Sequence, residues 1–131
     1  MKERDIQTAI LWGAGSLPAT MIWRNTVGVA KQIRRDLSIG HIKYGVVGSA
    51  DLMGIKRKEL DVRTTTNPHG FQPHEAHKIT PVGLAFAIEV KKPGKKQTKE
   101  QRAWQEAWEA MGGRYLLADD ADVAVKWVRS L

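Results

Sequence analysis

Two oppositely charged side chains close an apolar stretch in the second half of the chain. Residues 83–90 read as an apolar run of about the length of one buried strand, and the turn signal Pro93-Gly94 follows it. Glu89 and Lys91 stand at the end of this run. Side chains two positions apart lie on the same face of a strand, so the pair is expected to point the same way. Buried charges are costly unless they are paired or bind a ligand, which makes this pair a candidate site.

A further carboxylate, Asp51, stands directly before another apolar segment and is preceded by Gly48, which lets the backbone approach closely. If the two segments pair as neighbouring strands, Asp51 and Glu89 can share a cation. Two hard carboxylates with open positions suit Mg²⁺ or Mn²⁺ rather than zinc. Such an ion polarises a phosphodiester and activates water. Lys91 can then orient that water and stabilise the developing negative charge.

Each of these residues also has a purely structural explanation. Asp51 can cap a turn, and Glu89 with Lys91 can form a surface ion pair at a strand end. Gln101 stands three residues after Thr98, in the spacing of a capping box, and can simply complete it. The spacing of these residues is compatible with a catalytic site and with these purely structural roles, and both explanations stay open.

The composition indicates a basic globular protein. With 131 residues, we expect a single domain over residues 1–131, and the formal charge of +7 suggests a polyanionic partner. The sequence has no cysteine, which excludes a disulfide framework and a thiolate metal site. It has no apolar run of the roughly 20 residues needed to span a membrane, and its first residues lack the apolar core of a signal peptide. We therefore expect an intracellular, cytoplasmic protein with no membrane partner.

The remaining patterns predict alternating helices and strands. Residues 25–40 read as a basic, partly irregular connection, and residues 56–82 as an insertion whose part 67–81 is a loop, because prolines and glycine gather there. The expected helices cover residues 3–13, residues 98–111 and a last segment capped by Asp119 or Asp120. The expected strands cover residues 20–24, a segment from His41 into 45–55, and residues 58–66, 83–90 and 114–118. This order predicts an α/β fold.

At these positions the chain resembles the VRR-NUC family of the PD-(D/E)XK nuclease superfamily, and the resemblance covers nearly the whole chain. It implies a restriction-endonuclease-like αβββαβ core, with a central mixed sheet flanked by helices. The matching features are Glu3 and Gln7 on the first helix, Trp23-Arg24-Asn25, Gly48 to Gly54 around Asp51, Ile88-Glu89-Val90-Lys91, and Gln101 with Trp104 before Gly112-Gly113.

The resemblance also implies roles for individual residues. Lys91 would be catalytic, and Gln101 would face the site from the following helix as part of the catalytic set. The 38 positions between Asp51 and Glu89 (89 − 51) exceed what a simple hairpin predicts. The implied metal ligands are Asp51, Glu89, the backbone carbonyl of Val90, and Glu3.

The expected function is that of a Mg²⁺- or Mn²⁺-dependent DNA endonuclease. By the same resemblance it would be a stand-alone enzyme of phages and bacteria, acting in the (host) cytoplasm. It would be a homodimer that cuts branched DNA in the manner of a Holliday-junction resolvase, as in DNA repair. The alternatives are another nuclease role (nickase, flap or restriction-like) and a DNA-binding module without chemistry. The expected DNA contacts are Lys92, Lys95, Lys96, Arg24 and Lys43, whose phosphate contacts would be independent of base sequence.

Overall fold

The computed structural model describes residues 1–33, 35–66 and 74–131. In this part of the chain, helices and strands alternate broadly as predicted, but the strand expected from His41 into 45–55 is divided into β3 and β4, with residues 45–51 as their connection. Their order is α1 (Glu3–Gly15), β1 (Thr20–Arg24), β2 (Gly28–Ile33), β3 (Ile39–Tyr44), β4 (Leu52–Thr66), β5 (His74–Val90), α2 (Lys99–Ala110), β6 (Arg114–Ala118) and α3 (Ala121–Ser130).

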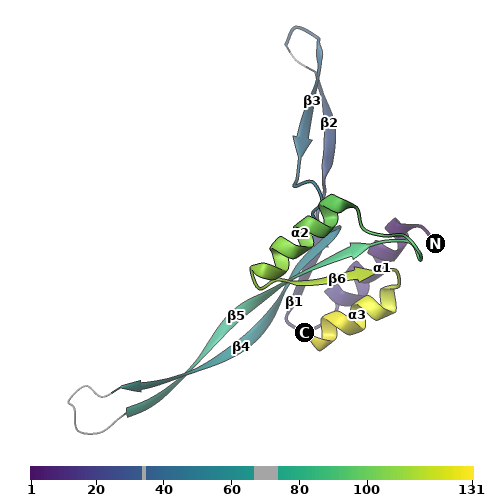
Figure 1. Ribbon diagram of the computed structural model, residues 1–131. Coiled ribbons are helices and arrows are strands. Elements are labelled where there is room, and N and C mark those ends of the chain that lie inside the picture. Colours follow the sequence, from purple (N-terminus) through teal and green to yellow (C-terminus); the bar gives the residue numbers. More distant parts are fainter. Residues whose placement is uncertain (34, 67–73) are drawn as a thin grey trace.

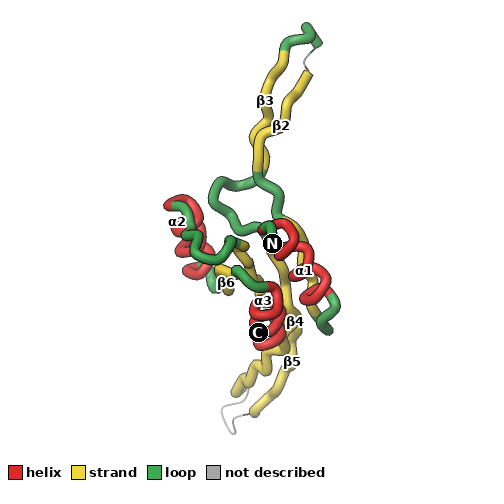
Figure 2. Tube along the Cα trace, turned by 90° about the vertical axis from the view of Figure 1, so that its right-hand side faces the viewer, coloured by secondary structure: helices red, strands yellow, loops and turns green. Residues whose placement is uncertain are grey.

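Four strands form one mixed sheet in the order β1-β4-β5-β6. The pairs β1/β4 and β4/β5 are antiparallel, whereas β6 runs parallel to β5. The helices α1 and α3 cover one face, and α2 lies on the other side of the sheet (Figures 1 and 2). This arrangement confirms the coarse α/β class. The core between the sheet, α1 and α3 contains Ile6, Ile10, Ala14, Leu52, Phe86, Ile88, Val90, Ala118, Ala124 and Val128.

The helices begin where their capping residues predict. The hydroxyl of Thr98 caps α2 in a capping box, and the carboxylate of Asp120 caps α3. The first helix continues two residues beyond the expected end, to Gly15. The apolar stripe expected on α2 is only half-buried, and Met111 at its end is 88% exposed, so this helix adds little to the core. No helix within the described residues is long and apolar enough to cross a membrane.

The interpretation of residues 25–40 as an irregular connection is wrong. The segment contains β2, which pairs with β3 as an antiparallel hairpin from Gly28↔Tyr44 to Ile33↔Ile39. This hairpin forms a sheet of its own and projects away from the rest of the molecule (Figures 1 and 2). The prediction failed because strand pairing depends on partners up to 16 positions away (44 − 28), whereas the local signals were basic side chains and turn residues.

Within residues 56–82, the strand expected over 58–66 is confirmed as part of β4, but the loop expected over 67–81 is wrong for residues 74–81, which belong to β5. The register of β4 and β5 continues without a break from Leu52↔Ile88 to Thr66↔His74, so the segment is the outer part of one long hairpin. Pro81 is tolerated because β6 pairs only with Phe86–Val90, which leaves β5 without a second strand neighbour at that point. The gap of 38 positions between the two carboxylates is therefore spanned by a simple hairpin with long strands.

Candidate active site

The β4–β5 register places the two predicted carboxylates side by side. Leu52 pairs with Ile88, so Asp51, just before β4, lies next to Glu89 near the end of β5. The backbone N–H of Val90 donates a hydrogen bond to Oδ2 of Asp51 at 2.8 Å. Because side chains alternate along β5, Ile88 and Val90 enter the core while Glu89 points to the opposite face. Glu89 is nevertheless only 2% exposed.

Gln101 has both of the roles that its spacing left open. Its Oε1 accepts a hydrogen bond from the backbone N–H of Thr98 at 2.8 Å, which completes the capping box of α2. Its Nε2 donates to Oε1 of Glu89 at 2.7 Å. One side chain thus fixes the start of α2 and orients the buried carboxylate.

Lys91 accompanies Glu89 as the spacing of two residues predicts. Its Nζ lies 3.7 Å from Oε1 of Glu89, and the lysine side chain is only 17% exposed. The pair is therefore not an ordinary surface ion pair, because both charges are largely removed from water. This geometry keeps a positive charge beside the carboxylates.

The site carries more negative charge than its partners balance. The pKa of Glu89 is raised to about 8, first by burial and then by the neighbouring Asp51 carboxylate, while Lys91 acts in the opposite direction. Burial also raises the pKa of Asp51, against the effect of the Val90 N–H. Oε2 of Glu89 is buried and has no hydrogen-bond partner among the described residues. A buried oxygen of this kind needs a partner, which a proton shared with the adjacent Asp51 carboxylate, a water molecule or a cation can supply.

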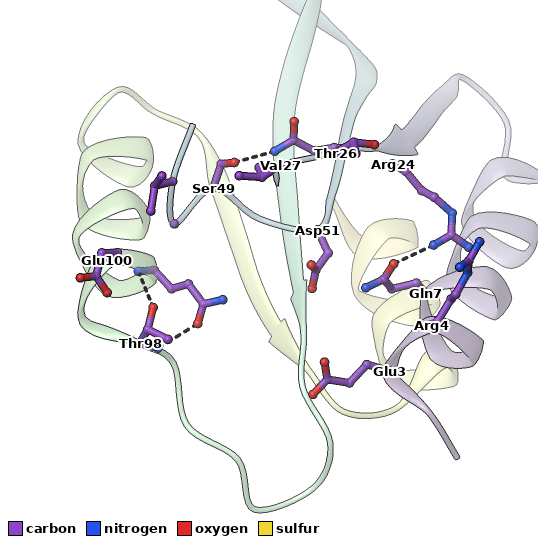
Figure 3. A pocket seen from close by; sticks show the side chains of 14 residues that line it. Glu3, Arg4, Gln7, Arg24, Thr26, Val27, Ser49, Asp51, Thr98 and Glu100 are labelled. Atoms are coloured by element: carbon purple, nitrogen blue, oxygen red, sulfur yellow. Dashed lines mark hydrogen bonds between the residues drawn. The ribbon is translucent and has the colours of Figure 1, made fainter. Parts of the chain in front are cut away.

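A cavity of about 790 Å³ opens beside Asp51. Figure 3 shows Asp51 between Glu3 of α1 and the first turn of α2, with Arg24 and Gln7 at the far side. Oε1 of Glu3 accepts a hydrogen bond from the backbone N–H of Lys92 at 3.2 Å, so α1 is tied to the turn that follows β5. The cavity therefore receives residues from α1, α2 and the segment before β4.

The donor set suits a hard divalent cation. Within the described ranges, no group of three or more His, Cys, Asp or Glu side chains forms a complete metal site. Asp51 lines the open cavity, and Glu89 beside it is buried with an unpartnered Oε2 but is not among the lining residues. These two carboxylates could hold Mg²⁺, which binds with few protein ligands and several waters. Glu3 lies in the same cavity but is not part of such a three-member group.

Asn25, predicted from the sequence only as part of Trp23-Arg24-Asn25 and without a role, supports the segment that carries Asp51. Its backbone N–H donates to the carbonyl of Asp51 at 2.8 Å, and its Nδ2 donates to Oγ of Ser49 at 2.8 Å and to the carbonyl of Ala50 at 2.9 Å. Three hydrogen bonds thus hold the segment that ends in Asp51. Its place directly after Trp23-Arg24 was the available signal, but the contact across 26 positions was not predictable from spacing.

Gly48 connects this segment to α2. Its φ is +85°, and a Cβ atom there would collide with the backbone of Glu100 and Gln101. Only glycine allows both the left-handed conformation and this close approach. Gln101 orients Glu89, and Asn25 holds the segment that leads from Gly48 to Asp51. The close contact between Gly48 and the backbone of Gln101 therefore joins the two structures that position the carboxylates.

The predicted DNA contacts fall into different places. Lys92, Lys95 and Lys96 are exposed on the turn between β5 and α2, next to the carboxylates in sequence. Arg24 lines the cavity, and its guanidinium donates to Oε1 of Gln7 and to Oγ1 of Thr8, each at 2.7 Å. The side chain of Lys43 lies outside the described residues.

A comparison of the chain with protein families, with curated proteins and with solved structures finds no match in any of them. The functional argument consequently depends on the site itself.

Proposed function

We propose that this protein is a divalent-metal-dependent DNA endonuclease of the PD-(D/E)XK type. The observation that carries the proposal is the buried pair Asp51 and Glu89 at the ends of adjacent strands, with Lys91 beside it and an unpartnered carboxylate oxygen. A DNA-binding module has no use for buried carboxylates near phosphate, because they repel it.

The residues divide the chemistry between them. Asp51, Glu89 and the carbonyl of Val90 would hold Mg²⁺ or Mn²⁺, which when bound polarises a phosphodiester and makes a water molecule more acidic. Lys91 holds a positive charge 3.7 Å from Oε1 of Glu89, where it can orient the attacking water and offset the negative charge of the transition state. Gln101 keeps Glu89 in place through its 2.7 Å hydrogen bond.

The fold supports this assignment. The elements α1, β1, β4, β5, α2 and β6 follow one another in the αβββαβ order of the superfamily core, if the β2–β3 hairpin is treated as an addition. The carboxylates stand on the second and third strands of that series. This agreement of order and position is consistent with the proposed superfamily, while the proposal itself depends on the site.

The proposed substrate is branched DNA. The net charge of +7 and the exposed lysines beside the site favour contacts to phosphates that are independent of sequence. Two copies related by a twofold axis would cut two strands of a four-way junction symmetrically, as a cytoplasmic resolvase does.

Cleavage assays test the proposal directly. A four-way junction, a nicked duplex and a linear duplex are incubated with wild-type protein in Mg²⁺, Mn²⁺ or EDTA. Lys91→Ala and Glu89→Ala are run in parallel, with Lys126→Ala as the control, since Lys126 is an exposed lysine of α3. We expect paired cuts in the junction, lost in EDTA and in both site variants but retained in the control.

Other results have equally definite meanings. Cutting of all three DNAs would support the proposed nuclease activity but reject selectivity for junctions, in favour of a nickase, flap or restriction-like role. Tight DNA binding without cutting in either metal would reject the enzyme and leave the DNA-binding module. Full activity of Lys91→Ala would remove that lysine from the mechanism.

A further inference from the structure

The end of the β2–β3 hairpin displays three large aliphatic side chains to solvent. Ile33 is 77% exposed, Leu37 is 82% exposed and Ile39 is 64% exposed. Ile33 and Ile39 form the last cross-strand pair of the hairpin, and Leu37 lies in the turn that joins the strands. We call these three residues the apolar tip. Neighbouring exposed aliphatics on a projecting element indicate a contact surface.

The turn that carries Leu37 is locally ordered. Oδ1 of Asp36 accepts hydrogen bonds from the N–H of Ser38 at 3.0 Å and from its Oγ at 2.6 Å. These bonds lower the pKa of Asp36. Leu37 has a φ of +65°, a left-handed conformation that residues with a side chain rarely adopt. The turn therefore places Leu37 at the end of the hairpin through a defined backbone conformation.

The hairpin starts and ends at the candidate active site. Thr26 and Val27, just before β2, and Val47 to Ser49, after β3, line the same cavity as Asp51. Figure 1 shows the hairpin projecting from this region, opposite the β4–β5 arm. Strands of six residues at about 3.3 Å per residue reach roughly 20 Å, which is the length of about six base pairs. DNA held in the cavity would therefore meet the tip within one helical turn.

The positive charge of the hairpin favours a polyanion as the partner of the apolar tip. Residues 28–44 contain four basic residues and one acidic residue, a net of +3 (4 − 1), and the whole chain carries +7. A second copy would bring a hairpin of the same sign, and the two would repel each other. A polyanion is attracted instead. The charged residues of this segment are Lys31, Arg34, Arg35, Lys43 and Asp36; Arg34 and the side chains of Lys31 and Lys43 lie outside the described residues.

We propose that the apolar tip is a wedge that enters between base pairs of the bound DNA and unstacks them, about six base pairs from the bond to be cut. Basic elements with an aliphatic side chain at their end distort DNA in this way, and unstacking costs least where pairing is already interrupted. The inference depends on the proposed function, because it names how that nuclease would select branched DNA.

Fluorescence of 2-aminopurine tests the wedge, because this base brightens when it is unstacked. The probe is placed at successive positions within ten base pairs of the branch in a four-way junction, and saturating protein is added in EDTA. Leu37→Gly removes the side chain and suits the positive φ of the turn. Ile79→Thr removes a comparably exposed aliphatic (65%) from β5 and is the matched control.

We expect wild type and Ile79→Thr to raise the fluorescence at one or two neighbouring positions at least threefold. Leu37→Gly should bind the junction within about threefold of wild type, measured by anisotropy, while its fluorescence stays near that of free DNA. No rise with wild type, or the same rise with Leu37→Gly, would overturn the wedge and assign the tip to a protein partner. Failure of wild type to bind DNA would overturn it as well.

Cleavage of the same junction in Mg²⁺ or Mn²⁺ separates the two proposals. Unstacking without metal-dependent cutting keeps the wedge and rejects the nuclease. Cutting without unstacking keeps the nuclease and rejects the wedge.

Discussion

Replacing Glu89 by glutamine should stabilise the metal-free protein at neutral pH. The pKa of the Glu89 carboxyl is 4.5 in the unfolded chain and is raised by burial to about 8 in the folded protein. Below pH 4.5 both states hold the proton. Between pH 4.5 and about pH 8 the unfolded chain releases the carboxyl proton, whereas the folded protein keeps it. The free energy of unfolding therefore falls as pH rises and levels off above about pH 8.

The size of the effect follows from the same values. At pH 7 the unfolded carboxyl is about 2.5 pH units above its pKa, and one unit corresponds to about 1.4 kcal/mol, which gives a loss of about 3 kcal/mol. Glutamine is neutral and its oxygen can still accept the hydrogen bond from Gln101. Lys91 lowers the pKa of Glu89, and this effect is already contained in the value of about 8. We expect Glu89→Gln to gain about 1–3 kcal/mol at pH 7, or roughly 4–12 °C in Tm.

Thermal unfolding followed by circular dichroism in EDTA, from pH 4.5 to 9, measures this difference. Glu106→Gln is the matched control, since Glu106 is an exposed glutamate of α2. The two variants should have similar Tm values at pH 4.5 and diverge as pH rises. A wild-type Tm that does not fall between pH 5 and 8, or equal behaviour of the two variants, would refute the assignment of Glu89 as a buried, uncompensated carboxylate.

Three further changes probe the fold, the site and the basic turn. Gly54→Ala should lower the free energy of unfolding by about 2 kcal/mol or more, because a Cβ atom there would collide with the ring of Phe86; an unchanged urea midpoint would contradict this packing. Asn25→Ala should weaken Mn²⁺ binding, measured calorimetrically, while the protein remains folded by circular dichroism; equal affinity would mean that its three hydrogen bonds do not position Asp51. Replacing Lys95 and Lys96 by alanine should reduce the salt dependence of DNA affinity by roughly one unit of slope per lost phosphate contact, and an unchanged slope would assign them to a solvated turn.

The hairpin that joins the two carboxylates shows where sequence patterns were sufficient and where they were not. The position of Glu89 at the end of an apolar run, and of Asp51 before another, indicated neighbouring strands correctly. The same patterns indicated the strand over 58–66 correctly but were misleading for residues 74–81, where the proline and the histidines suggested a loop although the segment pairs with β4. Lys56 lies in β4 and donates to the carbonyls of Val128 and Arg129, the last turn of α3, a contact that spans more than seventy positions.

The sequence by itself determined the features that depend on neighbours within a few residues. These are the helix caps at Thr98 and Asp120, the central strand and the same-face placement of Glu89 and Lys91, since each follows from backbone periodicity or a local hydrogen bond. Only the tertiary structure decided what surrounds Glu89. Its 2% exposure and raised pKa require Asp51, Gln101 and the sheet to exclude water together. Desolvation is a property of the assembled fold, because no single contact along the chain removes a carboxylate from solvent.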